Sequence, residues 1–360
     1  MQLYILLFEV LFLIGCVKWG IPLWQKTFKK DDITVGYFLN IVAGLSSLAI
    51  LGGAFFTAFY ENTDLLLPTT IIFLASAGSI LTAVFQNNKK ISFCFTVLLC
   101  ATGLFLLPEG ITLSYTNFQD ILFKFISLIS WIFFIWMMHQ FDRIPLFSFS
   151  VFSVLFLTAS IMCTNIFPFL PALFQPLCLL ALTTITLNSF LFKNRGIFCL
   201  GPSFIFFISY IIGYFGYCLS ANGLSAGIPI FIAYELMEIL LAIGTNIFLY
   251  HKLSPIQTPF FIEKVFSKGI NLTKAMRKIF SINFFFAMLG LLTTYTIQKN
   301  VTIFNINNMF FMYGCTIILL FNIYLTFHNW GKTNAELKNL FKDIKNGLAT
   351  LKDEFKKNKK

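Results

Sequence analysis

The chain has 360 residues, of which 58% are hydrophobic and 11% are charged, with a formal net charge of +11. Its mean hydropathy is +0.81. A soluble domain of this size cannot expose so much apolar surface to water, so the composition excludes a soluble globular protein and predicts a membrane protein. The basic residues lie between and after apolar runs. This favours an anionic lipid over nucleic acid as the partner.

Apolar runs long enough to cross a bilayer, about 18 residues or more, recur along the chain. They predict an all-α, polytopic helical bundle of about eleven transmembrane helices that forms one domain over residues 1–330. The first run, Tyr4 to Val17, has no basic leader and no small-residue cleavage site before Lys18, so we expect a retained helix. The predicted spans are 1–24, 36–60, 64–85, 91–108, 120–138, 145–163, 168–192, 197–219, 227–250, 279–298 and 303–327.

The distribution of basic residues predicts the orientation of the bundle. If the N-terminus is outside and the C-terminus is cytoplasmic, every Lys and Arg except Lys124 and Lys299 lies on the cytoplasmic side. Basic residues gather in the cytoplasmic loops of membrane proteins. We therefore expect a multi-pass protein of the inner (cytoplasmic) membrane. Its inner loops are expected near residues 25–35, 86–90, 139–144, 193–196 and 251–278.

The tail, residues 331–360, is predicted to be a separate cytoplasmic segment. Between Leu337 and Phe355 its apolar residues recur at helical spacing among many lysines, as in an amphipathic helix lying on a membrane surface. A helix that pairs with a partner helix in a homo- or hetero-oligomer is the alternative.

The order of short motifs around the ninth predicted span is distinctive. Residues 228–230 read Ile-Pro-Ile, and an apolar helix with Glu235 and Glu238 follows. Residues 250–255 then read Tyr-His-Lys-Leu-Ser-Pro, and residues 268–271 read Lys-Gly-Ile-Asn. This order resembles the polyprenyl-phosphate N-acetylhexosamine-1-phosphate transferases. That family has a proline-led span ending in an acidic residue, a basic stretch leading to Ser-Pro-Phe, a histidine cluster and a Gly-Leu-Ser.

Two further loops extend the resemblance. Residues 198–203 read Phe-Cys-Leu-Gly-Pro-Ser and resemble the family's Phe-Leu-Gly-Asp-x-Gly-Ser stretch, with Pro202 at the aspartate position. Residues 139–145 fall where the family reads Asn-x-x-Asp-Gly-x-Asp-Gly. In this comparison Asp142 matches the first aspartate, and Pro145 replaces the second.

Other residues of the family are missing from this chain. Gln86 and Asn87 stand where the family has two adjacent aspartates, and residues 259–264 lack the histidine cluster. The resemblance implies attack of a lipid phosphate on a UDP-sugar, with Mg²⁺ held by carboxylates. Only Asp142 and Glu238 remain at acidic positions. We therefore expect this transfer to be lost or strongly impaired, and we predict no metal site.

Basic side chains nevertheless persist on the predicted cytoplasmic loops. The candidates for binding a phosphate or substrate are Arg143, Lys193, Arg195, His251 and Lys252. The orientation of the bundle requires such charges in any case, which is the simpler explanation. His139 is a candidate acid or base close to Asp142, although a loop histidine is more often solvated. We expect Asp142, Arg195 and Lys252 to converge on one cavity, beside a lipid groove between the middle and ninth spans.

Glu9, Glu235 and Glu238 are carboxylates within predicted spans, where a charge is costly and often functional. Glu235 and Glu238 lie on one helix face because they are three residues apart. This spacing suits either a proton relay or a pairing with a cation from a neighbouring span.

Three functions fit these observations. The first is a catalytically inactive homologue of the transferases that retains a cytoplasm-facing groove for a lipid phosphate in envelope glycan synthesis. The second is an active sugar-1-phosphate transferase with an altered metal site, which would use UDP-sugar, polyprenyl phosphate and Mg²⁺. The third is a transporter or lipid flippase that uses the intramembrane glutamates, for which broken helices near the membrane centre would be evidence.

Overall fold

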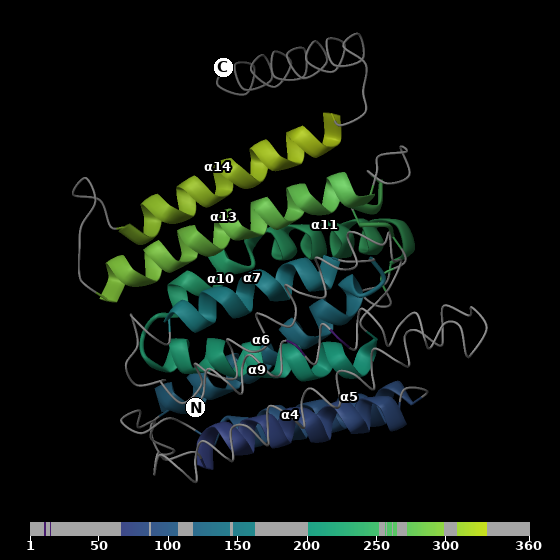
Figure 1. The fold of residues 1–360 in the computed structure, drawn as a ribbon, viewed down its shortest axis with the longest axis vertical. Coiled ribbons are helices and arrows are strands. Elements are labelled where there is room, and N and C mark those ends of the chain that lie inside the picture. Colours follow the sequence, from purple (N-terminus) through teal and green to yellow (C-terminus); the bar gives the residue numbers. More distant parts are fainter. Residues whose placement is uncertain are drawn as a thin grey trace, which may run out of the picture.

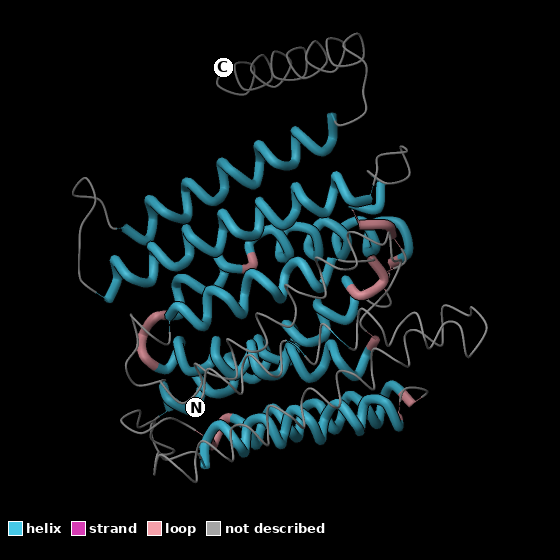
Figure 2. Tube along the Cα trace, viewed as in Figure 1, coloured by secondary structure: helices cyan, strands magenta, loops and turns pink. Residues whose placement is uncertain are grey.

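The computed structural model describes a bundle of helices, with no strand among the residues it describes (Figures 1 and 2). Fold class was therefore predicted correctly from composition. The described residues are Leu11, Gly15, 66–85, 88–106, 118–144, 147–162, 201–251, 256, 258–260, 262–264, 272–298 and 308–329.

The described helices run along one common direction (Figure 1). In chain order they are α4 (Leu66–Val84), α5 (Lys89–Gly103), α6 (Phe118–Phe141), α7 (Phe147–Ile161), α9 (Pro202–Ala221), η3 (Ser225–Gly227), α10 (Ile228–Phe231), α11 (Ala233–Tyr250), α13 (Leu272–Gln298) and α14 (Asn308–Asn329).

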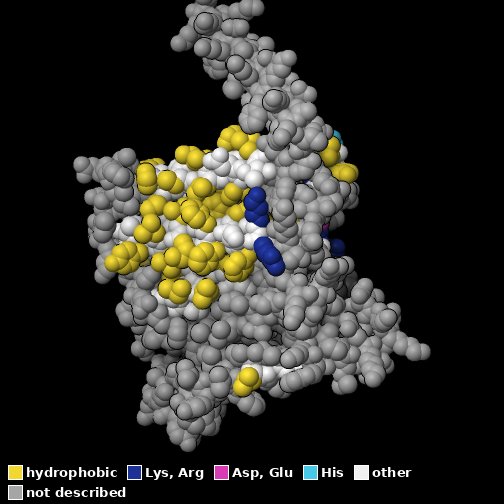
Figure 3. All heavy atoms as spheres, turned by 45° about the horizontal axis from the view of Figure 1, so that its top comes forward, with side chains coloured by type: hydrophobic (Ala, Val, Ile, Leu, Met, Phe, Trp, Pro, Cys, Tyr) yellow, Lys and Arg dark blue, Asp and Glu magenta, His cyan; other side chains and the backbone are white. Residues whose placement is uncertain are grey.

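Four of these helices, α6, α9, α11 and α13, are long and apolar enough to cross a membrane. Large hydrophobic side chains such as Phe125, Phe248 and Phe321 are exposed on the outside of the bundle. Figure 3 shows hydrophobic side chains spread over one face of the molecule, with Lys and Arg side chains at its edge. A surface of this kind is stable in lipid and not in water, so the chain is a multi-pass membrane protein.

The helices follow most of the predicted spans within a few residues, with two corrections. The predicted ninth span, 227–250, is not one helix, because Ile232 interrupts it between α10 and α11. The predicted fifth inner loop, 251–278, is too long, because α13 already begins at Leu272. The predicted spans 1–24, 36–60 and 168–192, the tail 331–360 and Glu9 lie outside the described residues, apart from Leu11 and Gly15 within the first span.

Helix α9 lies at the centre of the described bundle and packs against α4, α6 and α7. Tyr210, Tyr214 and Tyr217 lie on one face of it, at i, i+4 and i+7. Their hydroxyl groups donate to the carbonyl oxygens of Leu99, Leu106 and Leu104 at 2.8, 2.8 and 3.0 Å. The last carbonyls of a helix have no partner within the helix itself. The tyrosines therefore satisfy the end of α5 inside an apolar bundle, where water is not available.

Trp131 of α6 packs against all three tyrosine rings, with centroid distances of 4.8, 6.0 and 6.4 Å. The indole reaches α9 because residue 213 is a glycine. A Cβ at Gly213 would overlap the ring of Trp131. The close approach of α6 and α9 therefore depends on the absence of a side chain at this position.

Basic residues gather at one end of the described bundle, which we call the basic end. Lys89 and Lys90 begin α5, and Arg277 and Lys278 lie near the start of α13. Arg143 follows α6, and Asp120 and Lys124 lie at the opposite end of that helix. The alternating directions of the helices bring these basic residues together (Figure 1).

We predict that Gly213→Ala lowers the thermal midpoint of the purified protein in detergent. The added methyl group would push Trp131 away from α9, and overpacking of this kind costs about 1 to 3 kcal/mol. The matched control is Gly244→Ala in α11, where a Cβ would meet nothing within 4 Å. The control should be neutral or slightly stabilising, because alanine favours a helix more than glycine does. Equal midpoints for the two variants would contradict this packing.

Candidate functional site

Asp142 and Arg143 lie in a tight turn at the basic end, directly after α6. The backbone N–H of Asp142 still donates to Met138, as in a helix, and the N–H of Ile144 donates to Phe141 at 2.9 Å and turns the chain. Phe141 and Ile144 are buried on either side of the turn. The two apolar anchors leave Asp142 and Arg143 facing the neighbouring loops.

Asp142 is bonded to the beginning of α9. Its Oδ2 accepts a hydrogen bond of 3.0 Å from the backbone N–H of Gly201. Gly201 has φ 82° and ψ 155°, a conformation that is essentially restricted to glycine, and Pro202 follows it in the first turn of the helix. The sequence Gly-Pro therefore directs one backbone donor at the carboxylate, which contributes negative charge at the positive end of the helix.

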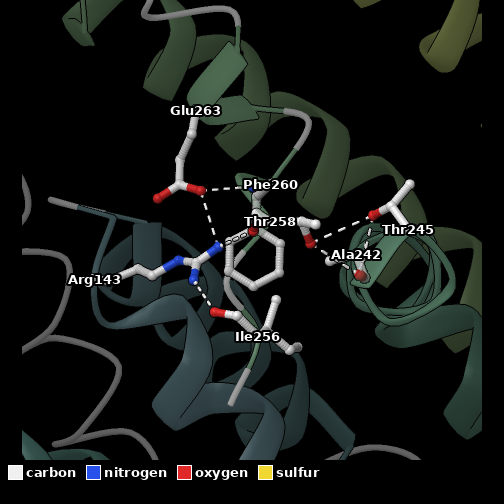
Figure 4. A network of polar contacts seen from close by, with 7 residues as sticks. All are labelled: Arg143, Ala242, Thr245, Ile256, Thr258, Phe260 and Glu263. Carbon is white, nitrogen blue, oxygen red and sulfur yellow. Dashed lines mark hydrogen bonds and ion pairs between the residues drawn. The ribbon is translucent and has the colours of Figure 1, made fainter. Parts of the chain in front are cut away.

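Arg143 joins the turn to the segment after α11 (Figure 4). Its guanidinium donates to the carbonyl oxygens of Ile256 and Thr258 at 3.0 and 2.9 Å. It also forms an ion pair of 3.0 Å with Glu263, whose carboxylate accepts a second hydrogen bond from the backbone N–H of Phe260. We call these five residues the Arg143 network.

Aromatic stacking holds the centre of the Arg143 network. The guanidinium carbon of Arg143 lies 4.1 Å from the ring centroid of Phe260, an arrangement that attracts a cation to the face of the ring. Phe260 is fully buried, and its ring lies 4.7 Å from that of Phe141. Phe260 therefore anchors the segment in the bundle while it supports the charged group above it.

Thr258 attaches the other side of the segment to α11. Its hydroxyl group donates to the carbonyl oxygen of Ala242 at 3.0 Å and lies 3.4 Å from the hydroxyl of Thr245 (Figure 4). Thr245 itself donates to carbonyl groups of its own helix. The segment is thus held between the turn after α6 and the last half of α11.

The structure brings together only some of the residues singled out from the sequence. Asp142 and Arg143 lie in the turn, and His139 lies in the last turn of α6. His251 ends α11 in a left-handed conformation with φ 52°, and its side chain is exposed. Glu235 and Glu238 are buried within the bundle. The remaining candidates, Lys193, Arg195 and Lys252, lie outside the described residues, so their convergence with Asp142 stays a prediction.

Sequence reasoning missed Glu263 and the backbone groups that partner Arg143 and Asp142. One signal for Glu263 was present, since it is an acidic residue in a predicted inner loop that is otherwise basic. No pattern in the sequence pointed to the carbonyl groups of Ile256 and Thr258. Arg143 was expected to be available for a phosphate, and the structure instead has it bonded to its own chain.

The described residues do not fit the Mg²⁺ ion that the resemblance implies for an active transferase. Within the described ranges no three His, Cys, Asp or Glu side chains are placed to hold a metal ion. Asp142 already accepts a backbone hydrogen bond, and its chain neighbour is a cation that would repel a metal. Mg²⁺ needs several oxygen ligands in a near-octahedral arrangement, which these residues do not supply.

An apolar cavity of about 630 Å³ lies in the other half of the bundle, between α6 and α11. Its walls include Ile126 and Phe134 of α6, Leu155 of α7, Gly216 of α9 and Leu236 of α11. Ile126 is also exposed on the outside of the bundle. The cavity therefore opens toward the surroundings of the helices, which are lipid in a membrane.

Comparison with known proteins adds no family to this picture. No protein-family model matches the chain, and no curated protein matches its sequence.

We predict that Arg143→Met lowers the free energy of unfolding by about 2 kcal/mol, because it removes three charged hydrogen bonds from a partly exposed side chain. Glu263→Gln should cost less, since the two carbonyl bonds of Arg143 remain. The double variant should resemble Arg143→Met alone, because the two residues act through one another. Thermal and denaturant midpoints in detergent measure these differences.

The matched control for this cycle is Arg277→Met, which changes an exposed arginine near the start of α13. It should shift the midpoint by less than about 0.5 kcal/mol. Additive effects of Arg143→Met and Glu263→Gln would show that the ion pair contributes nothing.

Proposed function

We propose that this chain is a catalytically inactive membrane homologue of the sugar-1-phosphate transferases. In this proposal it holds polyprenyl phosphate, or another anionic lipid, at the cytoplasmic face of the inner membrane and serves envelope glycan synthesis as a binding or assembly subunit. The observation that carries it is the way in which the loops meet at the basic end.

The positions that the resemblance assigns to the transferase site lie close together in the fold. Asp142 belongs to the third predicted inner loop, Gly201 to the stretch before the eighth span, and residues 256–264 to the fifth inner loop. Hydrogen bonds join the first to the second and the adjacent Arg143 to the third. A scaffold that brings these loops together supports descent from such an enzyme.

The contacts that join these loops also argue against transfer chemistry. Catalysis of this reaction requires charged groups directed at the reacting phosphates. In this structure the Asp142 carboxylate accepts a backbone N–H, and the Arg143 guanidinium is bonded to Glu263 and two carbonyl groups. Both side chains stabilise the loops themselves. This favours an inactive homologue over a transferase with an altered metal site.

The apolar cavity supplies a place for the hydrocarbon chain of the lipid. Its wall on α6 reaches Phe134, and the helix ends at Phe141, about 10 Å further along its axis. A long chain can therefore lie in the cavity with its phosphate at the basic end. Exposed Lys89, Lys90 and Arg277 supply positive charge there.

The test is a pair of measurements on the purified full-length protein. We predict saturable binding of polyprenyl phosphate and no transfer of radiolabelled sugar phosphate from UDP-N-acetylhexosamine, with either Mg²⁺ or Mn²⁺ present. Turnover that Asp142→Asn abolishes would instead establish an enzyme with an altered metal site. Absence of both binding and turnover would exclude a lipid-phosphate function.

A cavity-filling variant sharpens the binding measurement. Gly216 lines the cavity, and a Cβ there would lie 3.9 Å from Ile228, so a larger side chain extends into open space. Gly216→Phe should weaken polyprenyl-phosphate binding at least about tenfold, whereas Gly244→Phe on the outside of α11 should not. Unchanged binding in Gly216→Phe would place the lipid chain elsewhere.

A further inference from the structure

Four polar side chains meet inside the bundle beside the break between α10 and α11. Ile232, with φ −116° and ψ 25°, separates the two helices. Glu235 and Glu238 lie one turn apart at the start of α11 and are 1% and 0% exposed. The buried hydroxyl group of Tyr234 donates to Oε1 of Glu238 at 2.7 Å. We call these three residues, with Asn283 of α13, the Glu235 cluster.

Asn283 approaches this cluster from the facing helix. It is 3% exposed and lies beside the carboxyl group of Glu235. Neither its amide nitrogen nor its amide oxygen has a hydrogen-bond partner among the described residues, and the same holds for Oε1 of Glu235. Buried polar atoms are paired in the great majority of proteins, so unpartnered atoms from two facing helices indicate a ligand.

The charge of the cluster determines the class of ligand. Glu235 forms no ion pair with a basic side chain of the described ranges. Two carboxylates one turn apart repel each other in an apolar bundle, and a cation between them removes that repulsion. Their oxygens, with the amide oxygen of Asn283, are suitable ligands for a hard cation.

The burial of the cluster favours a monovalent cation over a divalent one. Mg²⁺ dehydrates reluctantly and usually keeps several waters, which side chains exposed by 3% or less leave little room for. Alkali cations are bound in membrane proteins at interrupted helices, where carbonyl groups leave the helical ladder. The interruption at Ile232 lies three residues before Glu235.

We propose that Glu235, Glu238 and Asn283 bind an alkali cation of the Na⁺ class inside the bundle, next to the break at Ile232. This inference is independent of the proposed lipid function. It gives the two intramembrane glutamates a role that neither a phosphate site nor the apolar cavity provides. The bound cation would tie α11 to α13 across the break.

The test compares the thermal midpoint of the full-length protein in detergent in Na⁺ and in choline at equal ionic strength, together with binding of ²²Na⁺. We expect Na⁺ to raise the wild-type midpoint saturably and ²²Na⁺ to bind with the same concentration dependence. Glu235→Gln and Asn283→Leu should abolish both effects. Glu235→Gln removes a buried charge, so it should fold without the cation even if Asn283→Leu does not.

Asn322→Leu is the matched control, because it makes the same change at an exposed asparagine of α14. It should respond to Na⁺ as the wild type does. The proposal is overturned if Na⁺, Li⁺ and K⁺ leave the wild-type midpoint unchanged, or if Glu235→Gln keeps the response. A midpoint that responds only to Mg²⁺ or Ca²⁺, or only to falling pH, would equally refute it.

Discussion

The arrangement of the basic end depends on one guanidinium group. Arg143 follows the last residue of α6, and its five donors can satisfy a carboxylate and two carbonyl groups at once. Backbone carbonyls near the membrane need such donors because the segment that carries them is not helical. Without Arg143, the carbonyls of Ile256 and Thr258 and the carboxylate of Glu263 would lose their shared partner.

This constraint relates the proposed function to the fold. A phosphoglycosyl transferase and its inactive homologue need the same approach of loops, because both bind a lipid phosphate where the helices end. They differ in what the polar side chains contact. In this chain Asp142 and Arg143 hold protein groups, and we propose that the resulting site binds a lipid and performs no transfer. The apolar cavity and the Glu235 cluster lie deeper in the bundle and can act separately from it.

Hydropathy and charge predicted the helical class and most of the described helix positions, because lipid demands long apolar runs whatever their contacts are. The pattern could not predict the break at Ile232, since the residues on both sides of it are apolar. The spacing of Tyr210, Tyr214 and Tyr217 shows that they share a helix face, but their partners are backbone carbonyls more than a hundred residues away. Side chains such as Arg143 could be chosen from the sequence as polar residues near the membrane, whereas their partners depend on the packing of distant loops.

The most direct measurement is hydrogen–deuterium exchange of the segment 256–264 in the wild type and in Arg143→Met. If Arg143 holds this segment, its amides should exchange at least about tenfold faster in the variant, while those of α9 around Tyr210 should not change. Equal exchange of the segment in both proteins would contradict the account, because the loops would then meet without Arg143. Faster exchange throughout the chain would contradict it as well, because it would reflect a general loss of stability.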